Sequence, residues 1–345
     1  MLLDAALAPT SLSQIPALAR AAESIGFSAV WTTETQHDPF LSLALAAEHT
    51  TRLRFGTAVA IGFARSPMTL AHTAWDLAAQ SGGRFILGLG TQVKAHVERR
   101  FGMPWPESPV GKLRELVLAL RAIWNAWQTG PQGRLNFRGE YFKLTLMSPF
   151  FNPGPIEHPR IPVFIAGVNT GLARLAGEVC DGFHVHPYHS PAYLREVLRP
   201  AIAAGAAKAG RAPSEIQMAG SVFVVASDAS REREFVRSQI AFYASTPSYR
   251  SVLAHHGWER AGEELSALAA RGQWESMPAL LTDEMLHTFA VAAPPQTPFG
   301  GLAALAAPLK ERYAGLLDRI TLYRPFAPGE DDAGWRALAE EMQRG

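Results

Sequence analysis

The stretch Ser81–Gly82–Gly83–Arg84–Phe85–Ile86–Leu87–Gly88–Leu89–Gly90–Thr91–Gln92 decides the fold. Its two adjacent glycines suit a turn that ends a helix, because glycine adopts left-handed backbone conformations at little cost. The apolar run Phe85–Leu87 predicts a buried strand, and Gly88 and Gly90 would let backbone or a ligand approach closely at its C-terminal end. In an α/β barrel that end carries the active site. A buried strand with two purely structural glycines is the alternative.

Beyond this stretch, short apolar segments alternate with segments whose apolar residues recur at helical spacing. Strands are predicted at residues 2–8, 29–33, 53–61, 85–87, 161–166, 182–186, 216–226 and 316–322, with helices between them. Strands joined by crossover helices run parallel, and eight of them close most simply into a ring. The chain 1–345 is therefore expected to form one α/β domain, a (β/α)8 TIM barrel.

Two segments interrupt this alternation, after the fourth and the seventh strand. Residues 93–160 contain a long amphipathic helix at 110–127 and an aromatic-rich stretch in which 137–142 is predicted as a hairpin. Residues 245–300 form an irregular helical region. Insertions of this length usually have a function or a structure of their own, so we expect the first to lie over one mouth of the barrel.

The composition is that of a globular enzyme with a large core. Hydrophobic residues make up 48% of the chain and charged residues 18%. The net charge is +1 and no basic run is present, so no nucleic-acid or membrane partner is expected. The N-terminal residues resemble neither a signal peptide nor a transmembrane helix. A single cysteine, Cys180, excludes an intrachain disulfide and suits the cytoplasm, where we expect the protein.

Polar residues follow the second predicted strand, at the catalytic end of the expected barrel. Glu34 and His37 place a carboxylate and an imidazole within four residues, which can serve acid–base chemistry or bind a cofactor. A loop pair without a function is the alternative for these two. Asp38 directly precedes Pro39 and is interpreted as a helix cap.

Two later strand ends also carry candidate residues. The turn Ala166–Gly171 exposes backbone N–H groups at a helix N-terminus, an arrangement that favours phosphate. His184 and His186 lie two residues apart on the sixth strand, so their side chains share a face. They could ligate a metal, as in a barrel hydrolase, but no third ligand is evident from the other strand ends. Lining of a binding site without a metal is the preferred interpretation.

Four stretches together resemble the bacterial luciferase-like monooxygenase superfamily, especially its branch that uses the deazaflavin coenzyme F420. They occur in family order at family-like spacing, across most of the chain, and the expected barrel is the family's fold. The stretches are 29–34, 56–59 with 65–67, 81–90, and 160–167 with 176–183.

The resemblance implies a cofactor at the C-terminal mouth of the barrel, and relatives are often homodimers. Ala58–Val59 matches a non-proline cis peptide bond that backs the cofactor ring. Glu34 matches an acidic residue near the deazaflavin carbonyl region. The rim beside the ring and the turn that contacts the phosphate-bearing tail are matched by Gly90, Thr91 and Gln92, and by Ala166, Gly167, Val168, Asn169 and Thr170.

Two departures from the family pattern narrow the expected activity. Sugar-phosphate dehydrogenases of the F420 branch, and the luciferases, carry a histidine directly after the acidic residue, where this chain has Thr35. The dehydrogenases also carry an acid soon after the Gly-x-Gly, where this chain has Val93. Both departures argue against a glucose-phosphate dehydrogenase, and Thr35 also argues against luciferase-type flavin hydroperoxide chemistry.

We therefore expect an F420-dependent oxidoreductase that transfers a hydride between the deazaflavin and an unknown small organic substrate. Glu34 would fix the cofactor, and His37 or His186 would be the acid–base residue. An FMN-dependent luciferase-like monooxygenase is the alternative within the family. The alternatives of another class are a metal-dependent TIM-barrel hydrolase built on His184 and His186, and a barrel that only binds a flavin-like ligand.

Overall fold

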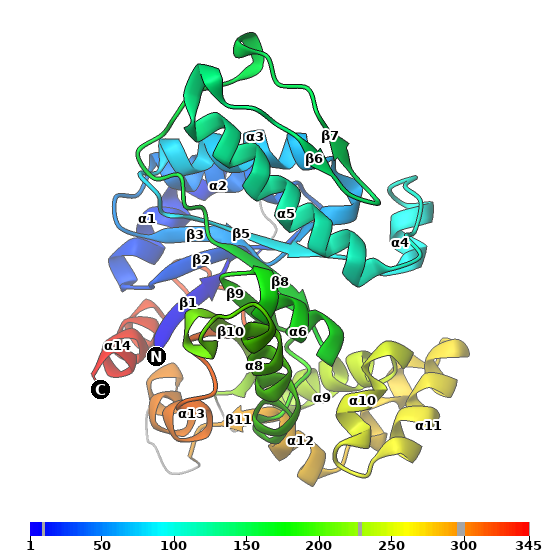
Figure 1. The fold of residues 1–345 in the computed structure, drawn as a ribbon. Helices are drawn as coiled ribbons and strands as arrows, with labels where there is room; N and C mark the ends of the chain where they lie inside the picture. Colours follow the sequence, from blue (N-terminus) through cyan, green and yellow to red (C-terminus); the bar gives the residue numbers. More distant parts are fainter. Residues whose placement is uncertain (9–10, 227–229, 295–300, 345) are drawn as a thin grey trace.

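Eight parallel strands close into a barrel with helices around its outside (Figure 1). The computed structural model describes residues 1–8, 11–226, 230–294 and 301–344. Each barrel strand pairs in parallel with the next, and the last returns to the first, which confirms the predicted (β/α)8 TIM barrel. In order around the ring the strands are β1 (Leu2–Ala6), β2 (Ala29–Thr32), β3 (Arg54–Thr57), β5 (Phe85–Gly90), β8 (Val163–Gly167), β9 (Gly182–Val185), β10 (Gln217–Val225) and β12 (Arg319–Leu322).

The helices that return the chain between strands turn an apolar face toward the barrel. Their first turns agree with the sequence signals: Asp38 caps its helix through Oδ1, which accepts from the N–H of Phe40 at 2.8 Å. The main helices are α1 (Ile15–Ile25), α2 (Pro39–Glu48), α3 (Pro67–Gln80), α5 (Pro109–Gln128), α6 (Thr170–Val179), α8 (Arg199–Lys208), α9 (Ser230–Ala244), α13 (Ala306–Tyr313) and α14 (Asp332–Gln343).

Several strands differ in extent from the sequence prediction. The segment 53–61 is not one strand, because the Ala58–Val59 peptide bond is cis and separates β3 from β4 (Ala60–Ile61). The last barrel strand begins only at Arg319, since residues 316 and 317 still donate backbone N–H groups to Tyr313 in the turn after α13. The glycines of the fourth barrel strand belong to it, so β5 runs on to Gly90.

Gly88 on β5 lies close to Thr57, at the end of β3. A Cβ on Gly88 would lie 1.8 Å from the Thr57 carbonyl oxygen, which is far inside van der Waals contact. The Thr57 hydroxyl donates to the Gly88 carbonyl at 2.6 Å and accepts from the Gly88 N–H at 2.9 Å. For Gly88 the structural interpretation is therefore correct.

An ion pair is buried where β1, β2 and β12 meet. Arg319 donates to both carboxylate oxygens of Asp4, through Nε and Nη2, each at 2.8 Å. The Trp31 indole N–H donates to the same carboxylate at 2.9 Å. Asp4 is 0% and Arg319 1% exposed, so this network joins the first and last strands without solvent.

The first insertion lies mostly outside the barrel rather than over its mouth. It contains α4 (Lys94–Arg99), α5 and the antiparallel hairpin of β6 (Phe137–Arg138) and β7 (Lys143–Leu144), which confirms the predicted hairpin. Glu115 on α5 accepts N–H groups from Glu140, Tyr141 and Phe142, which fixes the hairpin to the outer helix layer. Since α4 lies at the rim and the hairpin packs on α5, the expected cover over the mouth is wrong for the hairpin (Figure 1).

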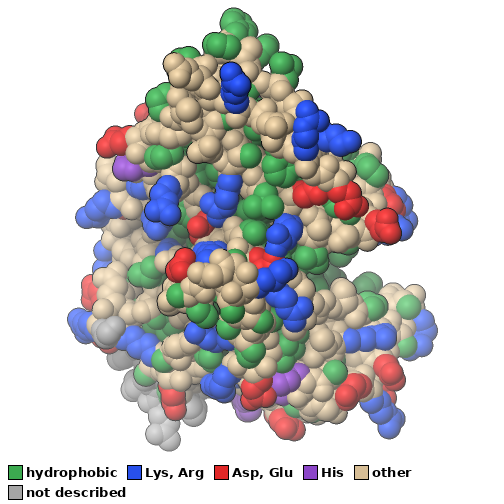
Figure 2. All heavy atoms as spheres, viewed as in Figure 1, with side chains coloured by type: hydrophobic (Ala, Val, Ile, Leu, Met, Phe, Trp, Pro, Cys, Tyr) green, Lys and Arg blue, Asp and Glu red, His purple; other side chains and the backbone are tan. Residues whose placement is uncertain are grey.

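The second insertion follows β10 and α9. It contains α10 (Arg250–Ala254), α11 (Glu259–Ala270), α12 (Asp283–Phe289) and β11 (Ala290–Ala292), which adds to β10 in parallel. Its predicted end, 295–300, lies outside the described residues. Nowhere in the described chain is a helix both long and apolar enough to cross a bilayer. On the face shown in Figure 2, acidic and basic side chains are intermingled, in line with the net charge of +1.

Candidate functional site

The ends of the parallel strands bring the predicted site residues to one mouth of the barrel. Glu34 follows β2, the cis bond follows β3, Thr91 and Gln92 follow β5, and the turn 166–170 ends β8. Figure 2 shows the molecule hollowed on this side, between the region of α4 and the region of α10 and α11. The mouth is therefore the candidate site, as parallel-barrel topology predicts.

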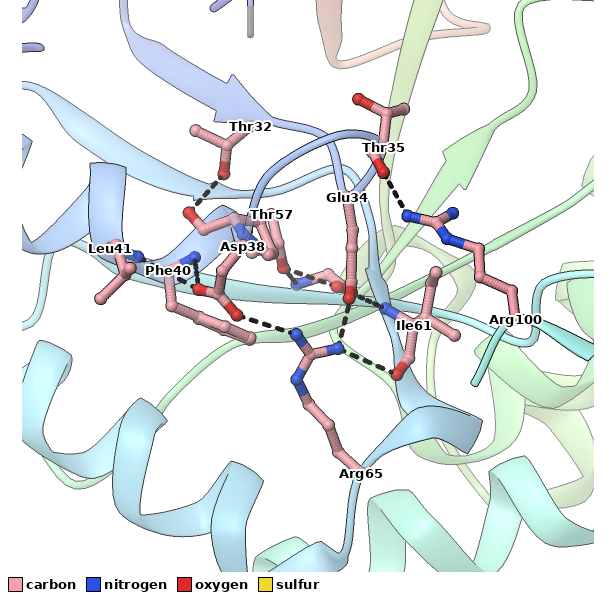
Figure 3. Close-up of polar contacts among 12 residues, drawn as sticks. Thr32, Glu34, Thr35, Asp38, Phe40, Leu41, Thr57, Ile61, Arg65 and Arg100 are labelled. Carbon is pink, nitrogen blue, oxygen red and sulfur yellow. Dashed lines mark hydrogen bonds and ion pairs between the residues drawn. The ribbon is translucent and has the colours of Figure 1, made fainter. Parts of the chain in front are cut away.

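Glu34 is buried and paired with Arg65 (Figure 3). Its Oε2 accepts from the Ile61 N–H at 2.7 Å and from Arg65 Nη1 at 2.6 Å. Arg65 also pairs with Asp38 at 3.0 Å. Burial opposes the charge of Arg65, but hydrogen bonds and ion pairs with the two carboxylates raise its pKa above the usual value. The site thus contains a fixed cation and a buried carboxylate.

The two carboxylate oxygens of Glu34 differ in their partners. Both of its hydrogen bonds fall on Oε2, and no described residue donates to Oε1. Through Oε2, Glu34 holds β4 in place immediately after the cis bond. Oε1 makes no hydrogen bond with the described residues, and the cofactor role of Glu34 stays a prediction.

The cis bond itself forms a bulge against the end of β5. Gly90 faces this bulge, and a Cβ there would lie 2.6 Å from Val59 Cγ2. Beyond it, Gln92 has a φ of 59°, and its side-chain Oε1 accepts the Val93 N–H at 2.9 Å. The cis position suggested by the family resemblance is thus present, and Gly90 is needed for close packing beside it.

We expect Gly90→Ala to lower the free energy of unfolding by about 1–3 kcal/mol, because its methyl group would displace Val59 from a packed position. Gly171→Ala is the matched control, since its Cβ would meet Val110 at an ordinary 3.6 Å. Urea unfolding of both variants measures the difference. Equal stability of the two variants would show that the approach of Gly90 to Val59 is not tight.

The turn 166–170 leads into α6 without a side-chain cap. Asn169 has extended backbone, but its side chain makes no capping bond to the helix. Instead its Nδ2 donates to the Ser248 carbonyl at 3.1 Å and its Oδ1 accepts from the Ser251 hydroxyl at 2.9 Å. These bonds tie the turn to the second insertion and leave the first N–H groups of α6 without a side-chain acceptor, which suits an anion.

The structure separates the histidines. His37 is exposed and lines a small pocket with Thr32, Thr33 and other residues at the ends of β1 and β2. His184 is buried between Trp31 and Phe164, with ring centroids 4.8 and 5.2 Å away, and burial lowers its pKa to about 3. His186 lies beyond the strand end among tyrosines.

A metal centre finds no support in the described residues. Among them, no group of three His, Cys, Asp or Glu side chains is placed to hold a metal ion. His184 contacts aromatic rings of the barrel core, whereas His186 contacts rings of the second insertion. The two do not form the shared ligand pair that the hydrolase alternative required.

Sequence reasoning missed the partners of the predicted residues. Arg65 was part of a family stretch, but nothing local indicated that it pairs with Glu34, 31 positions earlier. Arg100 donates to the Thr35 carbonyl and joins the insertion to the loop after β2. No local motif marks Tyr243 or Tyr249, and only the fold brings them to His186.

Comparisons with known proteins place this geometry in a family. The sequence matches the profile of luciferase-like monooxygenases over residues 3–310. A Mycobacterium tuberculosis protein without an assigned function is 46% identical over 316 residues, 90% of each chain. The F420-dependent glucose-6-phosphate dehydrogenase of Nakamurella multipartita is 28% identical over 277 residues, 76% of this chain and 78% of that one.

A solved structure shows the same fold. The coenzyme F420-dependent tetrahydromethanopterin reductase of Methanopyrus kandleri superposes with a TM-score of 0.78 at 21% identity, covering 99% of this chain and 98% of that one. The profile match covers most of the chain. The closed barrel and the cis bond after its third strand are consistent with that match. The chain belongs to the luciferase-like monooxygenase family.

Proposed function

We propose that this protein is an F420-dependent oxidoreductase that transfers a hydride between the deazaflavin and a small organic substrate. The observation that carries the proposal is the ion pair of the buried Glu34 with Arg65 at the barrel mouth, which leaves Oε1 of Glu34 without a donor among the described residues. Relatives named for F420 support the choice of this cofactor. The bound deazaflavin would donate or accept the hydride, so the protein would provide binding, orientation and electrostatics.

The residues at the mouth fit such a group. Because Gly90 has no Cβ, Val59 can pack against the end of β5, and the bulge would then lie directly behind a flat ring. Oε1 of Glu34 would accept a hydrogen bond from the ring, while Arg65 holds the carboxylate in place through Oε2. The uncapped N-terminus of α6 would bind the phosphate-bearing tail.

The test is a competitive titration of the purified protein with F420 and with FMN, followed by absorption and fluorescence. We expect F420 to bind more tightly than FMN, and Glu34→Ala to weaken F420 binding. Tighter binding of FMN would favour the monooxygenase alternative. If Glu34→Ala bound F420 as tightly as the wild type, Glu34 would not be a cofactor-binding residue.

We expect Asn169→Asp to weaken F420 about five- to tenfold, because it places a negative charge at the N-terminus of α6 where the phosphate would bind. The phosphate-free deazaflavin core should lose little affinity. Asn152→Asp is the matched control: Asn152 lies in the first insertion and donates to the Gly130 carbonyl at 2.8 Å. If Asn169→Asp weakened F420 and the phosphate-free core by the same factor, the phosphate-bearing tail would not bind at the N-terminus of α6.

A further inference from the structure

A cluster of aromatic rings lies at the side of the mouth opposite the cis bond. In the ring of strands, β9, β10 and β12 are opposite β2, β3 and β5. The ring cluster comprises His186 after β9, Phe223 on β10, Tyr243 at the end of α9, Tyr249 in the second insertion and Tyr323 after β12. Glu34, the cis bond and Gly90, which would hold the cofactor ring, lie in the other half, so the cluster faces the space left for a substrate beside that ring.

The rings pack closely around His186 and Tyr243. The centroid of the His186 ring lies 4.7 Å from that of Tyr243, nearly perpendicular to it, and 4.6 Å from that of Tyr249. The ring centroids of Tyr323 and Phe223 are 4.6 Å apart. His186 and the three tyrosines are only partly buried.

The hydroxyl protons of two tyrosines are ordered by their partners. Tyr323 donates its hydroxyl to Oε1 of Gln239 at 3.2 Å. The 2.8 Å contact between the hydroxyls of Tyr243 and Tyr323 must therefore have Tyr243 as its donor, because Tyr323 has no second proton. Neither proton is available to a ligand.

His186 supplies a donor in a fixed tautomer. Its Nδ1 accepts the Tyr188 N–H at 3.1 Å, so in the neutral ring the proton is on Nε2. Burial, followed by the nearby His189, lowers the pKa of His186 to about 3, and the ring is neutral at physiological pH. No described residue accepts a hydrogen bond from Nε2, which is therefore free to donate to a ligand.

The ring cluster offers nothing to balance a charge. Within the described chain, no Lys, Arg, Asp or Glu side chain forms a hydrogen bond with these rings or stacks on them. An ionised ligand would lose hydration there without a counterion. A flat, uncharged ligand would gain contacts with the rings and would lose little hydration free energy.

We propose that the ring cluster binds the substrate as an uncharged compound with a flat ring and a carbonyl group, and that His186 Nε2–H donates a hydrogen bond to the carbonyl oxygen. The proposal rests on the proposed function in one respect, that the cofactor ring occupies the opposite half of the mouth. It makes His186 a hydrogen-bond donor to the substrate at neutral pH rather than a general acid or base.

The test compares two probes, acetophenone and ethylbenzene, which share a ring but differ in the carbonyl. Their affinities are measured by ligand-observed NMR on the full chain without cofactor. His186→Phe keeps a ring and removes the donor, so it should weaken acetophenone about fivefold and leave ethylbenzene unchanged. His186→Gln keeps a donor and should restore most of the acetophenone affinity. His49→Phe, at the end of α2, is the matched control and should change neither affinity.

Other outcomes overturn the proposal. If His186→Phe weakened both probes equally, His186 would contribute packing and not a hydrogen bond. If benzoate bound more tightly than acetophenone, the proposal that the substrate is uncharged would be wrong. Acetophenone that does not bind the wild-type chain would remove the ring cluster as a substrate site. Because the probes are titrated without cofactor, failure of F420 to bind is a separate result that concerns the proposed function alone.

Discussion

Replacement of Asp4 by Leu is expected to lower the free energy of unfolding by about 3–5 kcal/mol. The variant leaves the Arg319 guanidinium, 1% exposed, without its carboxylate in the barrel core. The Trp31 indole N–H loses its acceptor in the same step. An unpaired buried charge costs much more than the pair contributes, because no water replaces the lost partner. Urea unfolding followed by circular dichroism measures the change.

The double variant Asp4→Leu with Arg319→Met separates the cost of the unpaired charge from the net value of the pair. We expect the second substitution to recover most of the lost stability, since both charges are then gone. Glu264→Ala, which removes an exposed ion pair with Arg260, is the control and should change little. A loss below about 1 kcal/mol for Asp4→Leu alone would contradict the argument.

The barrel could be predicted because its signals are local. Alternating apolar segments, glycine turns and helix caps such as Asp38 are each visible within a few residues, and they agree along the chain. The ends of strands were predicted less well where a feature outside the strand sets the residue at which the strand begins or ends. The cis bond after Thr57 ends β3 early, and the turn from Tyr313 delays β12.

The candidate site was predicted only in part, because its partners are distant in sequence. Glu34 was found from its place after a strand, but its pairing with Arg65 needed the fold. Asp4 and Arg319 are 315 positions apart, and Tyr243 and Tyr323 are 80 apart. Such pairs follow from the closure of the barrel and not from any short pattern. The hairpin at 137–144 shows the same limit, since Glu115 places it on the outer side of α5.

Acidification from pH 7 to pH 5 is expected to destabilise the protein through three histidines that are buried or partly buried. Burial is the main cause that lowers the pKa of His184 and of His186 to about 3, and that of His189 to about 4. In the unfolded chain these groups titrate near the ordinary value of about 6.5. Below that pH the unfolded state binds more protons than the folded state, so stability is complete above about pH 6.5 and falls toward the folded pKa values.

The expected slope is about 1.4 kcal/mol per pH unit for each histidine, and up to about 4 for the three together once the unfolded groups are fully protonated. Urea unfolding between pH 7 and pH 5 measures it. His184→Phe should reduce the slope by about one third, because the ring between Trp31 and Phe164 is kept and one titrating group is lost. His96→Gln, on the exposed side of α4, should leave the slope unchanged. A stability that stays constant over this range would mean that the three histidines gain water or a counterion on protonation, which would also weaken the argument that His186 acts as a neutral donor.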